Sequence, residues 1–257
     1  MKPGSLFDLS GEVSIVTGGG IGLGLQMATA LAEAGSNIVV CARKVERCEA
    51  AAHEIGKLGV QVIALRCDIT REEEVDHVVK ETLKKFQKVN ILINNAGRTW
   101  GSKPEDLKVD DWKKVIDLNV TGTFVFTQKV GQEMIKQKRG KIINITSFNG
   151  LRGSDPIYMD AIPYSTSKGA LVSFTKDLAV KWARYNINVN AIAPGWFSTQ
   201  MTKWSFENYG ENILVRIPFH RFGGESDLKG ATIFLASGAS DYVTGQVLSV
   251  DGGLTAW

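Results

Sequence analysis

The sequence is poor in the residues that build metal sites and disulfide frameworks, with only three cysteines and three histidines among 257 residues. Cys41, Cys48 and Cys67 show no metal-binding spacing, and their odd number favours reduced thiols. The histidines are scattered singly along the chain. We therefore expect no bound metal.

Long apolar runs and strong charge are also missing. No apolar run approaches the roughly 20 residues that span a bilayer, and Met1–Ser10 lacks the apolar core of a signal peptide. We expect a soluble, cytoplasmic protein without a membrane partner. The net charge is only +3, and no basic stripe with interleaved aromatic residues appears, so we expect no nucleic-acid partner.

Short β-branched runs alternate with amphipathic stretches along the whole chain, and no linker or repeat divides it. We expect strands over 13–17, 37–41, 61–66, 90–93, 141–146, 187–192 and 246–250, and helices over 22–34, 44–57, 71–87, 111–137 and 163–184. Strands that alternate with helices imply parallel βαβ units. The pattern predicts an α/β protein: a single Rossmann-type, doubly wound domain over 1–257, with a seven-stranded parallel sheet and helices on both faces.

One long stretch, from Gly195 to Gly224, has no clear periodicity and is rich in aromatic and methionine side chains, among them Trp196, Phe197, Met201, Trp204, Phe206, Tyr209 and Phe219. An irregular stretch of this length in a compact domain is usually a functional lid or is disordered. Its aromatic content argues against disorder. We expect a substrate lid over 195–222.

The first predicted strand runs directly into a glycine-rich turn, T-G-x-x-x-G-x-G over 17–24, where a helix begins. Glycine lets the backbone approach a pyrophosphate without a Cβ clash, and a helix N-terminus offers free N–H groups to the anion. A glycine turn alone is weak evidence. Its place at the first strand-to-helix junction predicts a dinucleotide site.

Tyr164 and Lys168 stand four residues apart on a predicted helix, which places both side chains on one face. The ordinary pKa of a phenol, about 10, is too high for easy proton exchange near neutrality. A neighbouring ammonium lowers that pKa, so Tyr164 can donate a proton to a forming alkoxide. Ser147, at the end of the fifth strand, is placed to hydrogen-bond the same substrate oxygen.

Together these motifs resemble the short-chain dehydrogenase/reductase family, over essentially the whole chain. The matching segments are the glycine motif at 17–24, Cys67–Ile69, the N-N-A-G segment Asn94–Gly97, Tyr164–Lys168, Pro194–Gly195 and Asp251–Gly253. The resemblance implies an oxidoreductase that moves a hydride between a nicotinamide cofactor and a carbonyl or secondary alcohol. It also implies a homotetramer, with the helices near 111–137 and 163–184 as interface candidates.

The resemblance assigns roles to individual residues. The implied catalytic residues are Asn119, Ser147, Tyr164 and Lys168; Asn119 holds a water in a proton relay through Lys168, which also reaches the nicotinamide ribose. The expected cofactor-binding residues are Gly18, Gly20, Ile21, Gly22, Gly24, Arg43, Lys44, Asp68, Ile69, Asn95, Ala96, Gly97, Tyr164, Lys168, Pro194, Gly195 and Thr199. Asp68 stands where the family contacts adenine.

The end of the second strand favours NADP(H) over NAD(H). Ala42 stands where the family's discriminating aspartate would fall, and Arg43 follows it. With no carboxylate to repel it, the 2′-phosphate can be held by the guanidinium fork. Arg43 as an exposed cap residue, or stacked on adenine, is the alternative.

The connection from Ser147 to Tyr164 is longer than in most members of the family. It carries Tyr158 and Met159, which can wall the substrate site, and Arg152, which is either solvated or paired with a carboxylate or phosphate. Trp100 is expected near the pocket mouth. The aromatic lid slightly favours a 3-oxoacyl thioester, carried on acyl carrier protein or coenzyme A. A sugar acid, as in gluconate 5-dehydrogenase, is the alternative, and long-chain, steroid-like and cyclic ketones stay open. A non-catalytic dinucleotide-binding protein is a third reading, against which the intact catalytic set argues.

Overall fold

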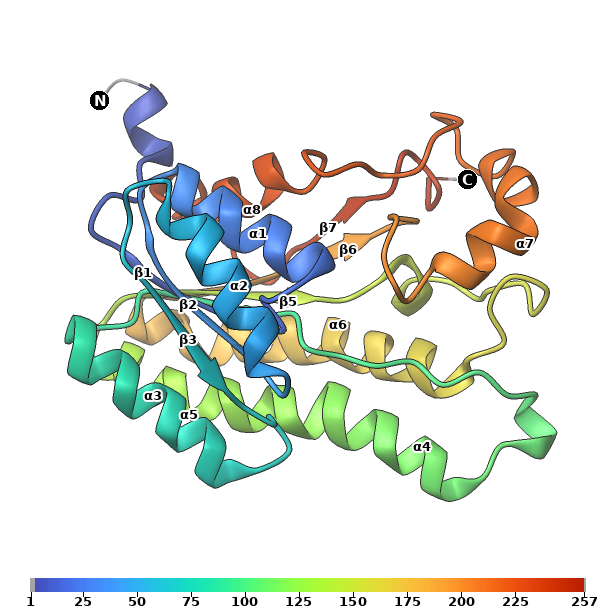
Figure 1. Cartoon of the computed structure of the whole chain (residues 1–257), viewed down its shortest axis with the longest axis horizontal. Helices are drawn as coiled ribbons and strands as arrows, with labels where there is room; N and C mark the ends of the chain where they lie inside the picture. Colours follow the sequence, from blue (N-terminus) through green and yellow to red (C-terminus); the bar gives the residue numbers. More distant parts are fainter. Residues whose placement is uncertain (1–2, 257) are drawn as a thin grey trace.

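The computed structural model describes residues 3–256 (Figure 1); Met1, Lys2 and Trp257, which belong to the expected domain 1–257, lie outside the described residues. Within the described chain, seven strands pair in parallel in the order β3-β2-β1-β4-β5-β6-β7. The strands are β1 (Val13–Thr17), β2 (Asn37–Ala42), β3 (Val62–Arg66), β4 (Ile91–Asn94), β5 (Gly140–Ile145), β6 (Ile187–Pro194) and β7 (Val247–Val250). The predicted single doubly wound domain is confirmed.

Helices cover both faces of this sheet. The longer helices are α1 (Gly22–Glu33), α2 (Val45–Gly56), α3 (Glu72–Phe86), α4 (Val109–Ile116), α5 (Thr123–Gln137), α6 (Ile162–Trp182), α7 (Lys203–Leu214) and α8 (Lys229–Ala236). Figure 1 shows α1, α2 and α8 above the sheet and α3, α5 and α6 below it, with α7 at the far end. The two layers follow from the right-handed crossovers of a parallel sheet.

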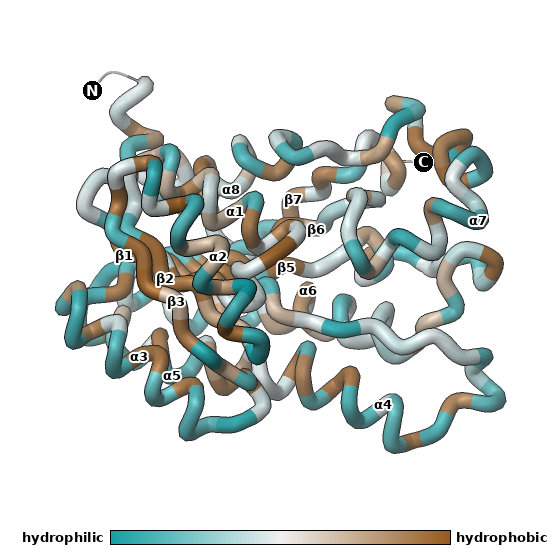
Figure 2. The backbone as a smooth tube through the Cα atoms, in the orientation of Figure 1, coloured by the Kyte–Doolittle hydropathy of each residue, from teal (hydrophilic) through white to brown (hydrophobic). Residues whose placement is uncertain are grey.

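The core is divided by the sheet into two apolar clusters. Neighbouring residues of one strand alternate between them: Val16 packs with α1, α2 and α8, while Ile15 packs with α3, α5 and α6. The central strands are therefore apolar on both faces, as Figure 2 shows in brown. This burial on both sides explains why the strands read as continuous apolar runs in the sequence.

Three parts of the chain differ from the sequence-based expectation. The helix expected over 111–137 is α4 and α5, joined by a π-helical turn over Asp117–Gly122. The stretch expected to be irregular contains α7, and α8 was not anticipated at all. Tyr209 interrupts α7 with non-helical backbone angles (φ −137°, ψ 16°). The helix α8 spans only 8 residues, and the sequence of α7 has no clear apolar periodicity.

The sheet order reverses between β1 and β4, since β2 and β3 lie on one side of β1 and β5 to β7 lie beyond β4. Ligands of open α/β sheets bind at such a reversal, outside the carboxyl ends of the strands. Among the residues that the structure describes, no helix is long and apolar enough to cross a membrane, and no group of three or more His, Cys, Asp or Glu side chains could hold a metal ion.

Candidate active site

The loop between β1 and α1 adopts a backbone shape that favours glycine. Gly18 and Gly22 have φ angles of +65° and +56°, in the left-handed region. A Cβ at Gly24 would lie only 2.3 Å from the carbonyl oxygen of Gly18, so α1 begins in direct contact with the loop. The backbone N–H groups of Gly20 and Ile21 donate to no described residue. The loop therefore fits the pyrophosphate of a dinucleotide.

The segment after β4 is tied to this loop by a threonine hydroxyl. The Oγ1 atom of Thr17 accepts hydrogen bonds from the N–H groups of Asn95 and Ala96, both at 3.0 Å. The Nδ2 atom of Asn95 donates to the carbonyl oxygen of Thr17 at 3.0 Å. Sequence reasoning quoted Thr17 as part of the glycine motif without assigning it a role. The structure shows that it joins two segments that we expect to bind the cofactor.

The adenosine end of the expected site lies at the ends of β2 and β3. Arg43 and Lys44 are exposed there, and Arg43 forms no hydrogen bond or ion pair with any residue of the described chain. Burial would raise the pKa of Asp68, but hydrogen bonds from Thr70 and the charges of Arg43 and Arg71 hold it below its ordinary value. Asp68 is thus an anion beside two guanidinium groups, one of which is available to a ligand.

Three expected catalytic side chains meet at the carboxyl end of β5. The Nζ atom of Lys168 donates to the carbonyl oxygen of Ile145 at 2.7 Å and lies 5.5 Å from the ring centroid of Tyr164. The hydroxyl of Ser147 accepts a hydrogen bond from the N–H of Asn149 at 3.2 Å and lies close enough to the phenol of Tyr164 to act on its pKa. A Cβ at Gly150 would lie 2.6 Å from the carbonyl carbon of Lys168, so the turn after Ser147 packs on the backbone of α6.

The fourth expected catalytic residue, Asn119, is buried in the π-helical turn. Its Oδ1 atom accepts from the N–H of Arg98, and its Nδ2 atom donates to the carbonyl oxygen of Arg98 and to the Oγ of Ser167, all at 2.9 Å. Ser167 also donates to the carbonyl oxygen of Tyr164 at 2.7 Å. Sequence reasoning missed Ser167, although its spacing of three from Tyr164 places it on the same helix face.

Gly97 joins this group to the cofactor side of the site. A Cβ there would lie 3.4 Å from Oδ1 of Asn119 and 3.6 Å from Nζ of Lys168. The π-helical turn is backed by Ile69, since a Cβ at Gly122 would lie 2.8 Å from an Ile69 side-chain atom. Single π turns often occur at functional sites. Here the turn brings Asn119 against both the N-N-A-G segment and α6.

Burial dominates the electrostatics of the tyrosine and the lysine. It raises the pKa of Tyr164 above its ordinary value, although the hydrogen bond with Ser147 opposes the change. Burial also lowers the pKa of Lys168 to about 8. The direction for Tyr164 is opposite to the one expected from the sequence, because in the protein alone burial outweighs its stabilising contacts. Lys168 still carries its charge in most molecules near neutrality.

The start of the expected lid lies beside the glycine loop. Gly195 follows β6, and its N–H donates to the carbonyl oxygen of Val250 at 2.9 Å, which fixes the end of Pro194 against β7. The hydroxyl of Thr199 is hydrogen-bonded to that of Thr202. A Cβ at Gly22 would lie 3.8 Å from the methyl group of Thr199. The segment therefore borders the expected cofactor path from the opposite side.

The rest of the expected lid packs against the long connection between Ser147 and Tyr164. A small apolar cluster joins them, formed by Phe148, Trp196, Ile213, Ile217 and Leu254, with Tyr158 and Met159 among its neighbours. The Oγ of Ser205 in α7 donates to the carbonyl oxygen of Tyr158 at 3.1 Å, and the rings of Tyr158 and Tyr209 meet at 5.8 Å. Trp100 is exposed and lies beside the guanidinium of Arg98.

Comparisons with known proteins agree with this geometry. A model of the short chain dehydrogenases matches residues 12–210. The chain is 40% identical to a 3-oxoacyl-[acyl-carrier-protein] reductase of Synechocystis, covering 96% of this chain and 98% of that protein. It is 37% identical to a 5-keto-D-gluconate 5-reductase of Escherichia coli, covering 97% of each. The structure of a gluconate 5-dehydrogenase from Burkholderia cenocepacia, in complex with NADP and tartrate, superposes with a TM-score of 0.93 at 35% identity and covers 99% of both chains.

Fold, site and relatives together define a nicotinamide-dependent oxidoreductase that acts on CH–OH or carbonyl groups. The chain belongs to the short-chain dehydrogenase family. The resemblances to 3-oxoacyl-carrier reductases and to gluconate 5-dehydrogenase that the sequence indicated are both confirmed. The two groups of relatives act on different substrates, so family membership alone leaves the substrate open.

Proposed function

We propose that the protein is an NADP(H)-dependent reductase of a small-molecule carbonyl, working in reverse as a secondary-alcohol dehydrogenase. The observation that carries this proposal is the meeting of Ser147, Tyr164 and Lys168 at the end of β5, with Asn119 linked to them through Ser167. The test is NADPH oxidation against a panel of 3-oxoacyl thioesters, keto-sugar acids and cyclic ketones. Stoichiometric NADPH binding without turnover of any of them would support the non-catalytic alternative.

Each catalytic side chain has a role that follows from its contacts. A bound nicotinamide would supply or accept the hydride. Ser147 donates a hydrogen bond to the substrate oxygen, and Tyr164 transfers the proton to or from that oxygen. The ammonium of Lys168 stabilises the phenolate that remains after transfer. Asn119, fixed by its three hydrogen bonds, orders the π-helical turn in which we place the relay water.

We propose a preference for NADP(H) because Arg43 offers an exposed, unpaired guanidinium where Ala42 leaves no competing carboxylate. Two similar proteins support this choice. The gluconate 5-dehydrogenase of Burkholderia cenocepacia was solved with NADP, and an NAD(P)-dependent one of Beutenbergia cavernae was solved with NADP at low occupancy. The remaining expected contacts, from the glycine loop to Thr199, are shared by both nucleotides and do not discriminate.

Arg43→Ala should weaken NADPH binding selectively, by roughly the 1.5–3 kcal/mol of a hydrogen bond to a charged group. NADH lacks the 2′-phosphate, so its affinity should stay within about twofold and serves as the internal control. Fluorescence titration of both nucleotides measures the difference. A wild-type preference for NADH, or an equal loss of both nucleotides in the variant, would contradict the assignment.

Two substrate classes have separate support. The 3-oxoacyl thioesters suit the 40%-identical carrier-protein reductase and the exposed apolar side chains of Trp100, Leu151 and Trp204. The keto-sugar acids suit the 5-keto-D-gluconate reductase and a cavity that is lined by Phe148, the residue after Ser147, and by two arginines and one aspartate. The sequence slightly favoured the thioester, and the cavity leads us to put the keto acid first.

We also propose that residues 195–222 form a lid. Its contacts with the connection 148–160 are the apolar cluster around Phe148, aromatic rings, one side-chain hydrogen bond and an exposed ion pair, rather than strand pairing. Hydrogen exchange should be fast in this segment in the free protein and slower when NADPH and substrate are bound. Equal protection in the free and ternary states would count against a lid.

A homotetramer, as the resemblance implies, and a cytoplasmic location stay predictions. Phe124 of α5 and Val180 of α6 expose 48% and 80% of their surface. Both helices belong to the stretches that we expect at the subunit interface. Burial of these side chains against a second copy would remove apolar surface from water.

A further inference from the structure

A narrow cavity begins at Phe148, the residue after Ser147. It is closed by Trp196 after β6, by Ile213 at the end of α7 and by Leu254 near the C-terminus. Its free volume is about 20 Å³, room for about one water molecule. A substrate group can enter only if one wall moves, and one of those walls belongs to the proposed lid.

Arg152 lines this cavity with one edge of its guanidinium unused. Its backbone N–H donates to the carbonyl oxygen of Phe148 at 3.2 Å, so the residue stands one turn beyond the catalytic serine. The Nη1 atom donates to the carbonyl oxygen of Leu254 at 2.8 Å. The Nε atom is buried without a partner, and no described residue accepts from Nη2. The Nε–Nη2 edge is the flat pair of donors that matches the two oxygens of a carboxylate.

None of the residues that the structure describes supplies a carboxylate for this edge. Asp155 is the only acidic residue that lines the described cavity, and it pairs with Arg216 at 3.1 Å. Arg216 also lies over the ring of Tyr158, at 4.9 Å from its centroid. Two guanidinium groups therefore face one carboxylate, which leaves one positive charge. A partly buried cation with an unsatisfied donor is costly unless an anion binds it.

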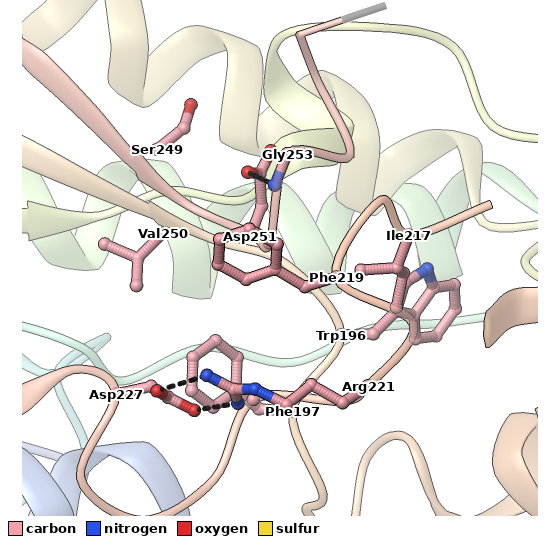
Figure 3. A pocket seen from close by; sticks show the side chains of 12 residues that line it. Trp196, Phe197, Ile217, Phe219, Arg221, Asp227, Ser249, Val250, Asp251 and Gly253 are labelled. Atoms are coloured by element: carbon pink, nitrogen blue, oxygen red, sulfur yellow. Dashed lines mark hydrogen bonds and ion pairs between the residues drawn. The ribbon is translucent and has the colours of Figure 1, made fainter. Parts of the chain in front are cut away.

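A second, larger cavity does not offer the same chemistry. It has a volume of about 270 Å³ and lies at the end of β7, also bordered by Trp196 (Figure 3). Its guanidinium, Arg221, donates to both oxygens of Asp227, at 2.6 and 2.9 Å. Its charge is therefore already neutralised within the protein. The free cation lies in the narrow cavity that begins beside Ser147.

We infer that Arg152 binds a carboxylate of the substrate, through its Nε–Nη2 edge, while Ser147 and Tyr164 hold the reacting carbonyl. This inference rests on the proposed function and names its substrate class: a small keto acid, with the acid group a few bonds from the ketone. A 3-oxoacyl thioester has no carboxylate at that place. The planar donor edge and the small volume favour a carboxylate over the bulkier phosphate.

The test compares two substrates with one carbon skeleton: 5-keto-D-gluconate, and L-sorbose, the neutral ketose with a hydroxymethyl group in place of the carboxylate. The wild type should prefer the keto acid in kcat/KM by at least about 20-fold, within the range for a hydrogen bond to a charged group. Arg152→Gln should bring this ratio close to one, through a higher KM for the acid alone. Arg152→Lys, which keeps the charge and loses the flat edge, should recover part of it.

Arg139→Gln is the matched control, because it removes a guanidinium that pairs with Glu12 at 2.9 Å and does not line the cavity. Its selectivity should stay within about threefold of wild type, and NADPH affinity should be unchanged in all three variants. Equal activity of the wild type on acid and ketose, or equal loss of both in Arg152→Gln, would overturn the inference.

Failure of the proposed function has a different signature. If the wild type reduces no ketone, calorimetry of the NADP⁺-loaded protein with D-gluconate and with glucitol still tests the subsite. Gluconate binding that is lost in Arg152→Gln upholds it. Absence of gluconate binding by the wild type overturns it.

Discussion

Tyr164→Phe should lower turnover by about 10²–10⁴-fold, the usual loss when a general acid is removed. The substitution deletes only the hydroxyl and keeps the ring against Lys168, so the fold and the nucleotide site should survive. NADPH affinity should stay within about twofold of wild type, because the glycine loop and Arg43 lie on other elements. Steady-state kinetics with an NADPH titration measure both. A variant within tenfold of wild-type turnover would refute the mechanism.

Lys168→Ala is the informative companion to this variant. It removes an ammonium with a pKa of about 8, and with it the charge that stabilises the phenolate and the expected contact to the nicotinamide ribose. Turnover and NADPH affinity should therefore fall together. The double variant should be no slower than the slower single one, since both residues serve one proton transfer. Multiplicative losses would show that the two residues act independently.

Gly24→Ala should cost the protein most of its affinity for NADPH. The added Cβ would lie 2.3 Å from the carbonyl oxygen of Gly18 and 2.5 Å from Nδ2 of Asn95, too close for either atom. The glycine loop must shift away from α1, and overpacking of this kind costs about 1–3 kcal/mol. We expect a drop of roughly 5- to 150-fold in NADPH affinity together with a lower Tm.

Gly230→Ala is the control for that experiment. Gly230 also lies in a helix, α8, but a Cβ there would meet nothing within 4 Å. Replacing it should raise stability by about 0.5–1 kcal/mol, because alanine has the higher helix propensity, and should leave NADPH binding unchanged. Equal behaviour of the two variants in the titration would show that the contact between Gly24 and Gly18 does not shape the nucleotide site.

The sheet was predicted well because its strands are buried on both faces, and such strands appear in the sequence as continuous apolar runs. Ile15 and Val16 face opposite clusters, and the resulting continuous apolar run is readable without a structure. The sequence of the helix α7 shows no such apolar pattern. Its side chains pack in an aromatic group with Trp196 and Phe222 rather than along one apolar stripe, and Tyr209 breaks its backbone.

The candidate site was predictable where one motif carries the residues and less so where distant segments meet. The spacing of four residues on a predicted helix was enough to predict that Tyr164 and Lys168 lie together. The links made by Thr17 and Ser167 depend on contacts between segments far apart in the chain. The two readings of Arg152, solvated or paired, could not be separated in the sequence, because the carbonyl oxygen of Leu254 reaches Arg152 only through the fold. We expected a lowered pKa for Tyr164 because the charge of Lys168 can be read from the sequence, whereas the burial of the phenol cannot.

The contact between Gly150 and the backbone of Lys168 has a consequence for altering this enzyme. It ties the turn after Ser147 to α6 through main-chain atoms. Residues 151–161 form a loop that leaves this turn and ends at the start of α6. We expect that this loop can be shortened, lengthened or exchanged with that of another family member while proton transfer is retained. It is therefore the place at which to introduce a new substrate preference.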